Sequence, residues 1–172
     1  MSQPIEKLSL SSLGLCLIVL MFGIVAQVVC SLFDVNPVAV FDRAYILVGD
    51  EITLNSLLDF QWHLLVIAGL FPAGLVWLMD RHVRVDFMYQ RQSEKTQARI
   101  NLAGNLVFAA PFFALVLPAA WTFVERAWTS DEGSRNAGIN DLWLIKSILP
   151  LGLGLLALAV LIESLRLMRK VR

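Results

Sequence analysis

The sequence predicts an all-α integral membrane protein with four transmembrane helices, both termini in the cytoplasm, and a short interfacial segment between the second and third helices. Three observations predict this fold. Of 172 residues, 58% are hydrophobic and 16% are charged, whereas soluble domains average about 45–50% and about 25%. The hydrophobic residues form four long blocks, and the cations collect on alternate connections. The composition also excludes a disordered chain, and the zero net charge argues against nucleic-acid binding.

Each apolar block is long enough to cross a bilayer as a helix. About 20 apolar residues span a hydrocarbon core of about 30 Å, and lipid requires every backbone polar group to be paired within the segment. The first block exceeds the h-region of a signal peptide, about 7–15 residues, so we predict that it is retained. A single membrane domain over residues 1–172 is expected, with helices at about 9–33, 58–79, 100–124 and 143–164.

Prolines interrupt the last three blocks, at Pro72, Pro111, Pro118 and Pro150. Neighbouring helices can satisfy the backbone groups that a proline leaves unpaired, so we predict kinks that shape the packing of the helices. A broken helix that forms a substrate site is the alternative, but such a site needs polar ligands beside the break. The sequence offers none there.

The distribution of cations predicts the orientation. Residues 80–99 carry five Lys or Arg residues and the C-terminal tail carries four, whereas the connection 34–56 carries one and the connection 125–141 carries two. Cytoplasmic segments hold the excess of Lys and Arg. Both termini and residues 80–99 are therefore placed in the cytoplasm, and the two acidic connections are placed outside.

The cysteines and histidines predict no cofactor or metal site. Cys16 and Cys30 lie about 21 Å apart on one predicted helix, too far for the disulfide limit of about 7 Å between Cα atoms. His63 and His82 are about 28 Å apart along another and cannot hold one haem between them. No cluster has the spacing of metal ligands. We predict no catalytic, cofactor-binding, metal-binding or substrate-binding residue.

The ionisable residues of the predicted spans lie near one boundary. Asp59 and His63 are one turn apart on one face of the second helix, with Gln61 and Trp62 between them. Lys146 lies near the same boundary in the fourth helix, where it can snorkel to the headgroups, pair with Asp59, or take part in transport. No ionisable side chain is expected near the middle of a span, which favours an accessory subunit over an autonomous transporter or an enzyme.

The connection after the second helix is amphipathic. If residues 80–87 are extended, His82, Arg84 and Asp86 share one side and apolar side chains share the other. Residues 88–99 are basic and helix-prone, and we predict that they lie in the membrane interface. Two interpretations fit this pattern. The segment can contact lipid while its charge sets the topology, or it can dock a partner specifically.

Three motifs resemble those of one family. Asp59-Phe60-Gln61-Trp62-His63-Leu64 opens the second helix and His82-Val83-Arg84-Val85-Asp86 follows it. The run into the fourth helix contains Asn136-Ala137-Gly138, Trp143, Lys146-Ser147 and Pro150-Leu151-Gly152. Each motif alone has low specificity. Together, in this order on four helices, they resemble the small membrane (Q-type) subunit of tripartite ATP-independent periplasmic (TRAP) transporters.

The resemblance implies a function in the bacterial inner membrane. Such transporters use a sodium gradient to import small organic acids: a periplasmic protein captures the substrate, and a large multi-spanning subunit moves it. The small, non-catalytic subunit binds and stabilises the large one and can aid docking of the periplasmic protein. Membrane lipids are the other expected partner, and no cofactor is expected. The residues expected at a partner interface or in a structural role are Asp59, Gln61, Trp62, His63, His82, Arg84, Asp86, Trp143, Lys146 and Pro150.

Two other functions stay open at this point. A self-sufficient small homo-oligomeric secondary transporter has the same four helices, and uptake by the chain alone would identify it. A membrane anchor for a redox enzyme would need haem ligands, which the spacing of the histidines does not supply.

Overall fold

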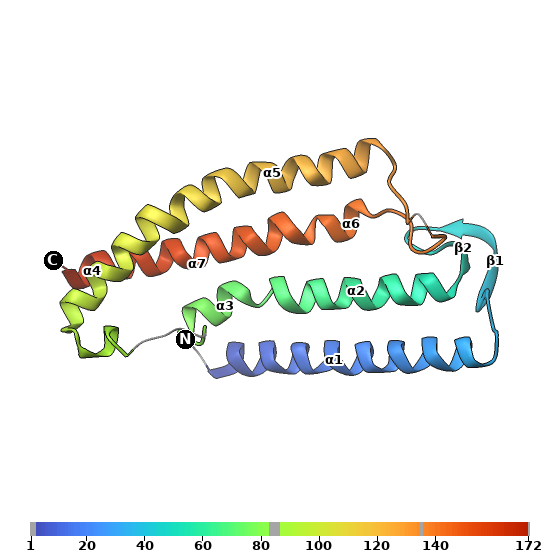
Figure 1. Cartoon of the computed structure of the whole chain (residues 1–172), viewed down its shortest axis with the longest axis horizontal. Coiled ribbons are helices and arrows are strands. Elements are labelled where there is room, and N and C mark those ends of the chain that lie inside the picture. The colour runs from blue at the N-terminus through green and yellow to red at the C-terminus, as the bar shows by residue number, and fades with distance from the viewer. Residues whose placement is uncertain (1–2, 83–86, 135, 172) are drawn as a thin grey trace. The chain divides into compact units, whose positions relative to one another are not determined.

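A computed structural model describes residues 3–82, 87–134 and 136–171, which are mainly helical (Figure 1). Within these residues, four stretches are long and apolar enough to cross a membrane: Lys7–Leu32, Leu54–Leu78, Glu94–Thr129 and Trp143–Val171. The predicted all-α class with four spans is confirmed. Each helical stretch extends beyond the predicted bounds at one end or both, because polar residues form its outermost turns.

The elements follow one another in a simple order along the described residues. They are α1 (Gln3–Leu32), β1 (Ala39–Tyr45), β2 (Gly49–Ile52), α2 (Leu54–Leu70), α3 (Ala73–Leu78), the 3₁₀ turn η1 (Tyr89–Arg91), α4 (Glu94–Gly104), the π-helical η2 (Asn105–Ala109), α5 (Ala110–Thr129), α6 (Trp143–Lys146) and α7 (Ile148–Val171). The chain divides into two compact units. The hairpin unit comprises Met1–Leu70 with Trp121–Leu149, and the cavity unit comprises Phe71–Ala120 with Pro150–Arg172.

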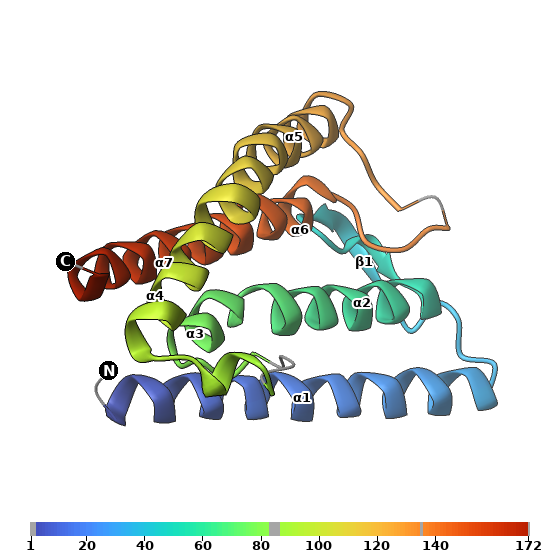
Figure 2. The same ribbon diagram turned by 60° about the vertical axis from the view of Figure 1, so that its left-hand side comes forward.

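In the hairpin unit, α1 and α2 run side by side in opposite directions (Figures 1 and 2). Gln61 on α2 donates from Nε2 to Oε1 of Gln27 on α1 (2.7 Å) and to the Gly23 carbonyl (3.4 Å). The Cys16 thiol lies 3.7 Å from the Leu64 carbonyl. Because lipid offers no competing partner, these bonds hold the two apolar helices in one register.

The sequence analysis did not predict the antiparallel hairpin of β1 and β2, which pairs Ala39 with Ile52 and Val40 with Glu51. Most of β1 is exposed, so the hairpin has little core of its own. A distant loop supports it: Asn140 donates from its N–H to the Leu47 carbonyl (2.7 Å), and the Leu47 N–H donates to Asp141 Oδ2 (3.1 Å). The hairpin therefore depends on a tertiary contact that local sequence patterns do not reveal.

Aspartates in the left-handed conformation end three helices: Asp34 after α1, Asp80 after α3 and Asp131 after α5. In each case the next residue donates back to a carbonyl five positions earlier, as Glu132 does to Ala127 (3.0 Å). This is the hydrogen bonding of a Schellman cap. Asp tolerates the left-handed conformation better than most non-glycine residues.

The prolines divide the spans where a backbone donor is missing. Pro72 precedes α3 and separates it from α2. Pro150 lies in the first turn of α7, where proline is tolerated, but it cannot donate to the Lys146 carbonyl, and α6 ends at that residue. Ahead of Pro111, the Ala110 N–H bonds to the Asn105 carbonyl, five residues back, which gives the π-helical turn η2.

Small residues make up the interior of the cavity unit. A Cβ added to Gly74 on α3 would lie 2.8 Å from the Leu155 carbonyl oxygen on α7, so only glycine permits this approach. Ala98 and Ala159 are also buried, and among the described residues no large side chain is fully buried. Asn105 Nδ2 donates to Ser164 Oγ (3.0 Å) and thereby joins η2 to α7. Small residues and side-chain hydrogen bonds are typical of helix packing in lipid.

The predicted interfacial segment is only partly separate from the third span. Ser93 caps α4 by accepting from the Thr96 N–H (3.3 Å), and α4 begins at Glu94. Helix α4 then continues through η2 into α5. Residues 94–99, which we expected in the interface, are therefore the first turns of the span. They are polar, and hydropathy alone assigned them to the connection.

Replacing the Gln61–Gln27 pair tests its contribution. Gln61→Leu and Gln27→Leu should each lower the thermal unfolding midpoint in detergent, because each leaves an unpaired amide. The double variant should be less destabilised than the sum of the two, with a coupling free energy of about 0.6–2 kcal/mol. A second double-mutant cycle, with Gln27→Leu and Asn55→Ala, is the control. Gln27 and Asn55 do not bond to each other, so their effects should add. Additive effects in both cycles would contradict the pairing.

Candidate functional site

Asp59 binds the loop that follows α5. Its Oδ2 accepts a hydrogen bond from the Ile139 N–H (3.1 Å). A Cβ added to Gly138 would overlap the Asp59 carboxylate and lie 2.6 Å from Ser134 Oγ. The glycine of the Asn136-Ala137-Gly138 motif is therefore required by the close approach of Asp59.

The first turn of α2 binds the same motif at two further points. Thr53 Oγ1 donates to the Ala137 carbonyl, and Asn55 Nδ2 donates to the Asn136 carbonyl, both at 2.6 Å. Thr53 also caps α2, because its hydroxyl accepts from the Ser56 N–H (3.1 Å). Two of the motifs found in the sequence are thus parts of one structure, in which the start of α2 holds the loop 136–139. Sequence reasoning missed Thr53 and Asn55, although the Thr53-to-Ser56 spacing resembles that of a capping box.

His63 contributes to α2 itself. Its Nδ1 bonds to the Asp59 carbonyl one turn earlier. A carbonyl can only accept, so Nδ1 carries the hydrogen of this bond. Nε2 is buried and has no hydrogen-bond partner among the described residues. Asp59 and His63 lie one turn apart on α2, as the sequence predicts, and the His63 ring bonds to the Asp59 backbone rather than to its carboxylate.

Gln61 and Trp62 of the same motif face in different directions. Gln61 is 8% exposed and bonds to α1, whereas the Trp62 side chain is 60% exposed. Trp62 is therefore left for lipid or a partner, and Phe60 of the same motif is also exposed, at 38%. Trp143, by contrast, stacks edge to face on Trp128 of α5, with ring centroids 4.6 Å apart.

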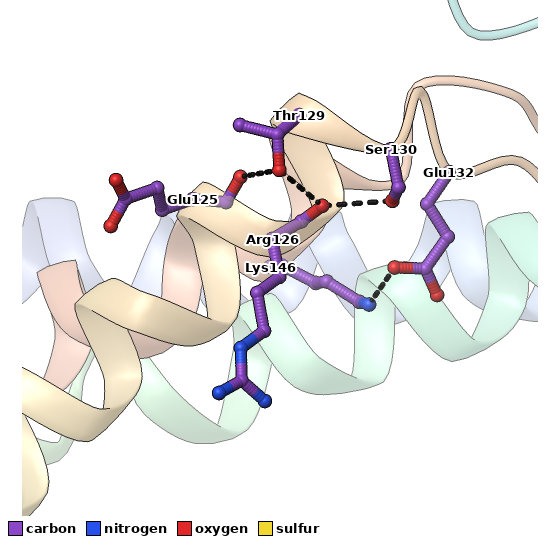
Figure 3. A network of polar contacts seen from close by, with 6 residues as sticks. All are labelled: Glu125, Arg126, Thr129, Ser130, Glu132 and Lys146. Atoms are coloured by element: carbon purple, nitrogen blue, oxygen red, sulfur yellow. Dashed lines mark hydrogen bonds and ion pairs between the residues drawn. The ribbon is translucent and has the colours of Figure 1, made fainter.

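Lys146 pairs with Glu132 rather than with Asp59. Its Nζ lies 2.5 Å from Glu132 Oε2 (Figure 3). The same atom lies 4.2 Å from the centre of the Phe123 ring. The Lys146 side chain is 16% exposed and that of Glu132 is 42% exposed. Pairing with Asp59 was one of three alternatives left open by the sequence; in the structure Lys146 bonds to Glu132, and the Asp59 carboxylate accepts from the loop backbone. Glu132 was not identified from the sequence, since it lies in the connection, outside the predicted spans.

Hydroxyl groups satisfy the last carbonyls of α5 beside this ion pair. Thr129 Oγ1 donates to the carbonyls of Glu125 (2.9 Å) and Arg126 (3.1 Å), and Ser130 Oγ donates to that of Arg126 (2.8 Å) (Figure 3). Helix ends leave such carbonyls unpaired. The end of α5 is thus satisfied before the chain turns into the loop held by Asp59 and Lys146.

The other predicted site residues belong to the cavity unit. His82 Nε2 lies 3.2 Å from the Ala73 carbonyl, and its ring packs against Trp77. Arg84 and Asp86 lie outside the described residues, so the extended pattern expected for residues 80–87 is not tested. Pro150 lies in the first turn of α7 and has the structural role described above.

The cavity unit contains a half-open cavity of about 820 Å³. Its lining is aromatic, aliphatic and acidic, and comes from α3, α4, η2, α5 and α7 together with Asp80 and His82. Among the described residues no group of His, Cys, Asp and Glu could hold a metal ion. The sequence analysis singled out neither this cavity nor Glu163, which lines it, because Glu163 lies beyond the predicted apolar block.

A protein-family model agrees with the positions of the three motifs. The model for the DctQ component of tripartite ATP-independent periplasmic transporters matches residues 45–170. This match includes α2, the connection after α3, and the run from Asn136 into α7. No curated protein and no solved structure matches the chain.

The ion pair of Lys146 can be tested against an exposed lysine. Lys146→Ala should lower the thermal unfolding midpoint by about 2–4 °C, because it removes an ion pair that contributes about 1 kcal/mol. Lys95→Ala, an exposed residue of α4, should leave the midpoint unchanged. Exchanging the charges with Lys146→Glu and Glu132→Lys should recover part of the loss. Equal midpoints for the two alanine variants would show that the pair does not stabilise the fold.

Proposed function

Since the chain belongs to the family of DctQ components of tripartite ATP-independent periplasmic transporters, it is a small permease subunit of such a transporter, and we propose that it binds and stabilises the large transmembrane subunit rather than moving substrate itself. The observation that carries this proposal is the amount of apolar helix surface that the chain leaves uncovered. No catalytic role is proposed for any of its residues.

The four spans cover little of one another. Only 6% of the most apolar window of Lys7–Leu32 is buried, and the largest share, in Trp143–Val171, is 17%. On α1 the side chains of Leu15, Phe22 and Val28 are exposed. Lipid can cover such a surface, but a chain of this length with so small an interior is well suited to packing against a larger membrane protein.

Three polar side chains of the spans support a scaffold role. Gln61, Asn105 and Lys146 each bond to another residue of this chain. A residue that binds an ion or a substrate must offer its polar atoms to the ligand, and buried polar groups in membranes are costly unless paired. Because these atoms already have partners, we assign sodium coupling and substrate movement to the large subunit.

We further propose that the chain is one multi-pass domain of the bacterial inner membrane, with both termini in the cytoplasm. The positive-inside rule supports this orientation, because residues 80–99 and the C-terminal tail hold most of the cations. It places the β1–β2 hairpin and the loop 130–141 in the periplasm, where they can aid docking of the substrate-binding protein. The proposed cargo is a small organic acid, imported with sodium.

Co-purification tests the assignment directly. A tagged chain, expressed in its native host and solubilised in a mild detergent, should elute with a much larger multi-spanning membrane protein. Mass spectrometry identifies the partner, and size-exclusion chromatography gives the mass of the complex. A chain that purifies only as a monomer would contradict the proposal. Gradient-driven uptake by liposomes containing this chain alone would favour the self-sufficient transporter instead.

Trp62 offers a residue-level test of the interface. Trp62→Ala should reduce the amount of co-purified partner several-fold, since exposed tryptophans are frequent interface hot spots, while the unfolding midpoint of the isolated chain stays unchanged. Trp121→Ala on α5 is the matched control, because Trp121 is similarly exposed. Full retention of the partner by the Trp62 variant would assign Trp62 to lipid.

A further inference from the structure

The cavity of the cavity unit has the dimensions of a ligand site. Its volume of about 820 Å³ falls within the range of about 300–1,000 Å³ that is typical of small-molecule sites. It lies among helices long and apolar enough to cross a membrane, and it is open on one side. The molecules that can enter it from a bilayer are amphiphiles, so the pattern of its lining decides which kind it fits.

The lining changes from polar to apolar along one helix. Asn101, Asn105, Phe108 and Phe112 all line the cavity, and they recur every three or four residues along α4, η2 and α5. Such spacing places them on one helix face, over a rise of about 16 Å. The Phe108 side chain is 76% exposed at the apolar end. A ligand with a polar head and an apolar tail matches this gradient.

Two carboxylates give the polar end its charge. Asp80 and Glu163 both line the cavity. Asp80 already interacts with another residue, whereas among the described residues Glu163 has no hydrogen-bond or ion-pair partner. A carboxylate at the edge of a membrane is costly without a counter-charge. Trp77 lines the same cavity and can bind a cation over its ring. This end of the cavity therefore selects a positively charged group.

Exposed arginines adjoin the lining residues in sequence. Arg99 precedes Ile100, and Arg166 follows Glu163 by three positions on the same side of α7. Guanidinium groups bind phosphate well. A ligand that carries a phosphate next to its cation matches this arrangement better than an isolated amine.

We propose that this cavity binds a phospholipid with a primary ammonium in its headgroup, with the ammonium against Glu163 and the first part of an acyl chain against Phe108 and Phe112. Phosphatidylethanolamine has this chemistry. Phosphatidylglycerol lacks the cation, and phosphatidylcholine lacks the N–H donors that a carboxylate accepts. The inference needs only that the chain lies in a membrane, so it stands or falls independently of the large subunit.

Lipid retention measures the binding. The full chain, in whatever complex it purifies, is washed in detergent with equal amounts of phosphatidylethanolamine, phosphatidylglycerol and phosphatidylcholine, and the retained lipid is quantified by mass spectrometry. About one equivalent of phosphatidylethanolamine should remain, in clear excess over the other two. The same lipid should raise the unfolding midpoint of the protein. Equal retention of the three lipids, or retention of none, would overturn the proposal.

Two variants locate the site. Glu163→Gln should reduce the retained phosphatidylethanolamine about tenfold, since a charge-assisted hydrogen bond is lost, whereas the exposed Glu125→Gln should not. Gly104 lines the cavity and has no atom within 4 Å of an added Cβ, so Gly104→Leu should fold normally and block the lipid. Gly69→Leu, with equal space but outside the lining, is its control. Unchanged retention in either cavity variant would contradict the assignment of the site.

Discussion

In lipid, a polar side chain must find its partner within the protein, and this constraint determines how the described helices are joined. The Gln61–Gln27 bond holds α1 to α2, and the Asn105–Ser164 bond holds η2 to α7. Apolar side chains cannot do this alone, because lipid tails solvate them as well as other helices do. The few amides and hydroxyls of the spans therefore specify helix pairs and register, while the apolar residues specify only that the segments enter the membrane.

Small residues complement these bonds. Gly74 lets α3 approach the α7 backbone, and Gly138 lets a loop approach the Asp59 carboxylate. With interiors of this kind, the large apolar side chains remain on the outside. A soluble protein would aggregate through such a surface, whereas a membrane subunit can use it to contact lipid and a larger partner. The small interior and the proposed scaffold role thus have the same physical origin.

The two acidic connections show how motifs distant in sequence become one structure. Thr53, which caps α2, and Asn55 and Asp59 on this helix bind the loop 136–139. The neighbouring residues Asn140 and Asp141 hold the β1–β2 hairpin. The Lys146–Glu132 pair secures the beginning of the same loop to α6. Residues that resemble a binding motif in the sequence therefore serve first to organise the segments between the spans. Trp62 makes none of these contacts, and its side chain is exposed.

The sequence by itself determined the class of the protein, because four uncharged blocks of sufficient length can only be helices in a bilayer, and its motifs identified the family. It also located Asp59, Gln61, Trp62 and Lys146 near one end of their spans. Tertiary structure alone decided their partners: Glu132 rather than Asp59 for Lys146, Gln27 for Gln61, and a loop backbone for Asp59. The hairpin and the acidic cavity also escaped prediction. Membrane insertion depends on local hydropathy, which a sequence displays directly, whereas pairing depends on which polar atoms meet after the helices have packed.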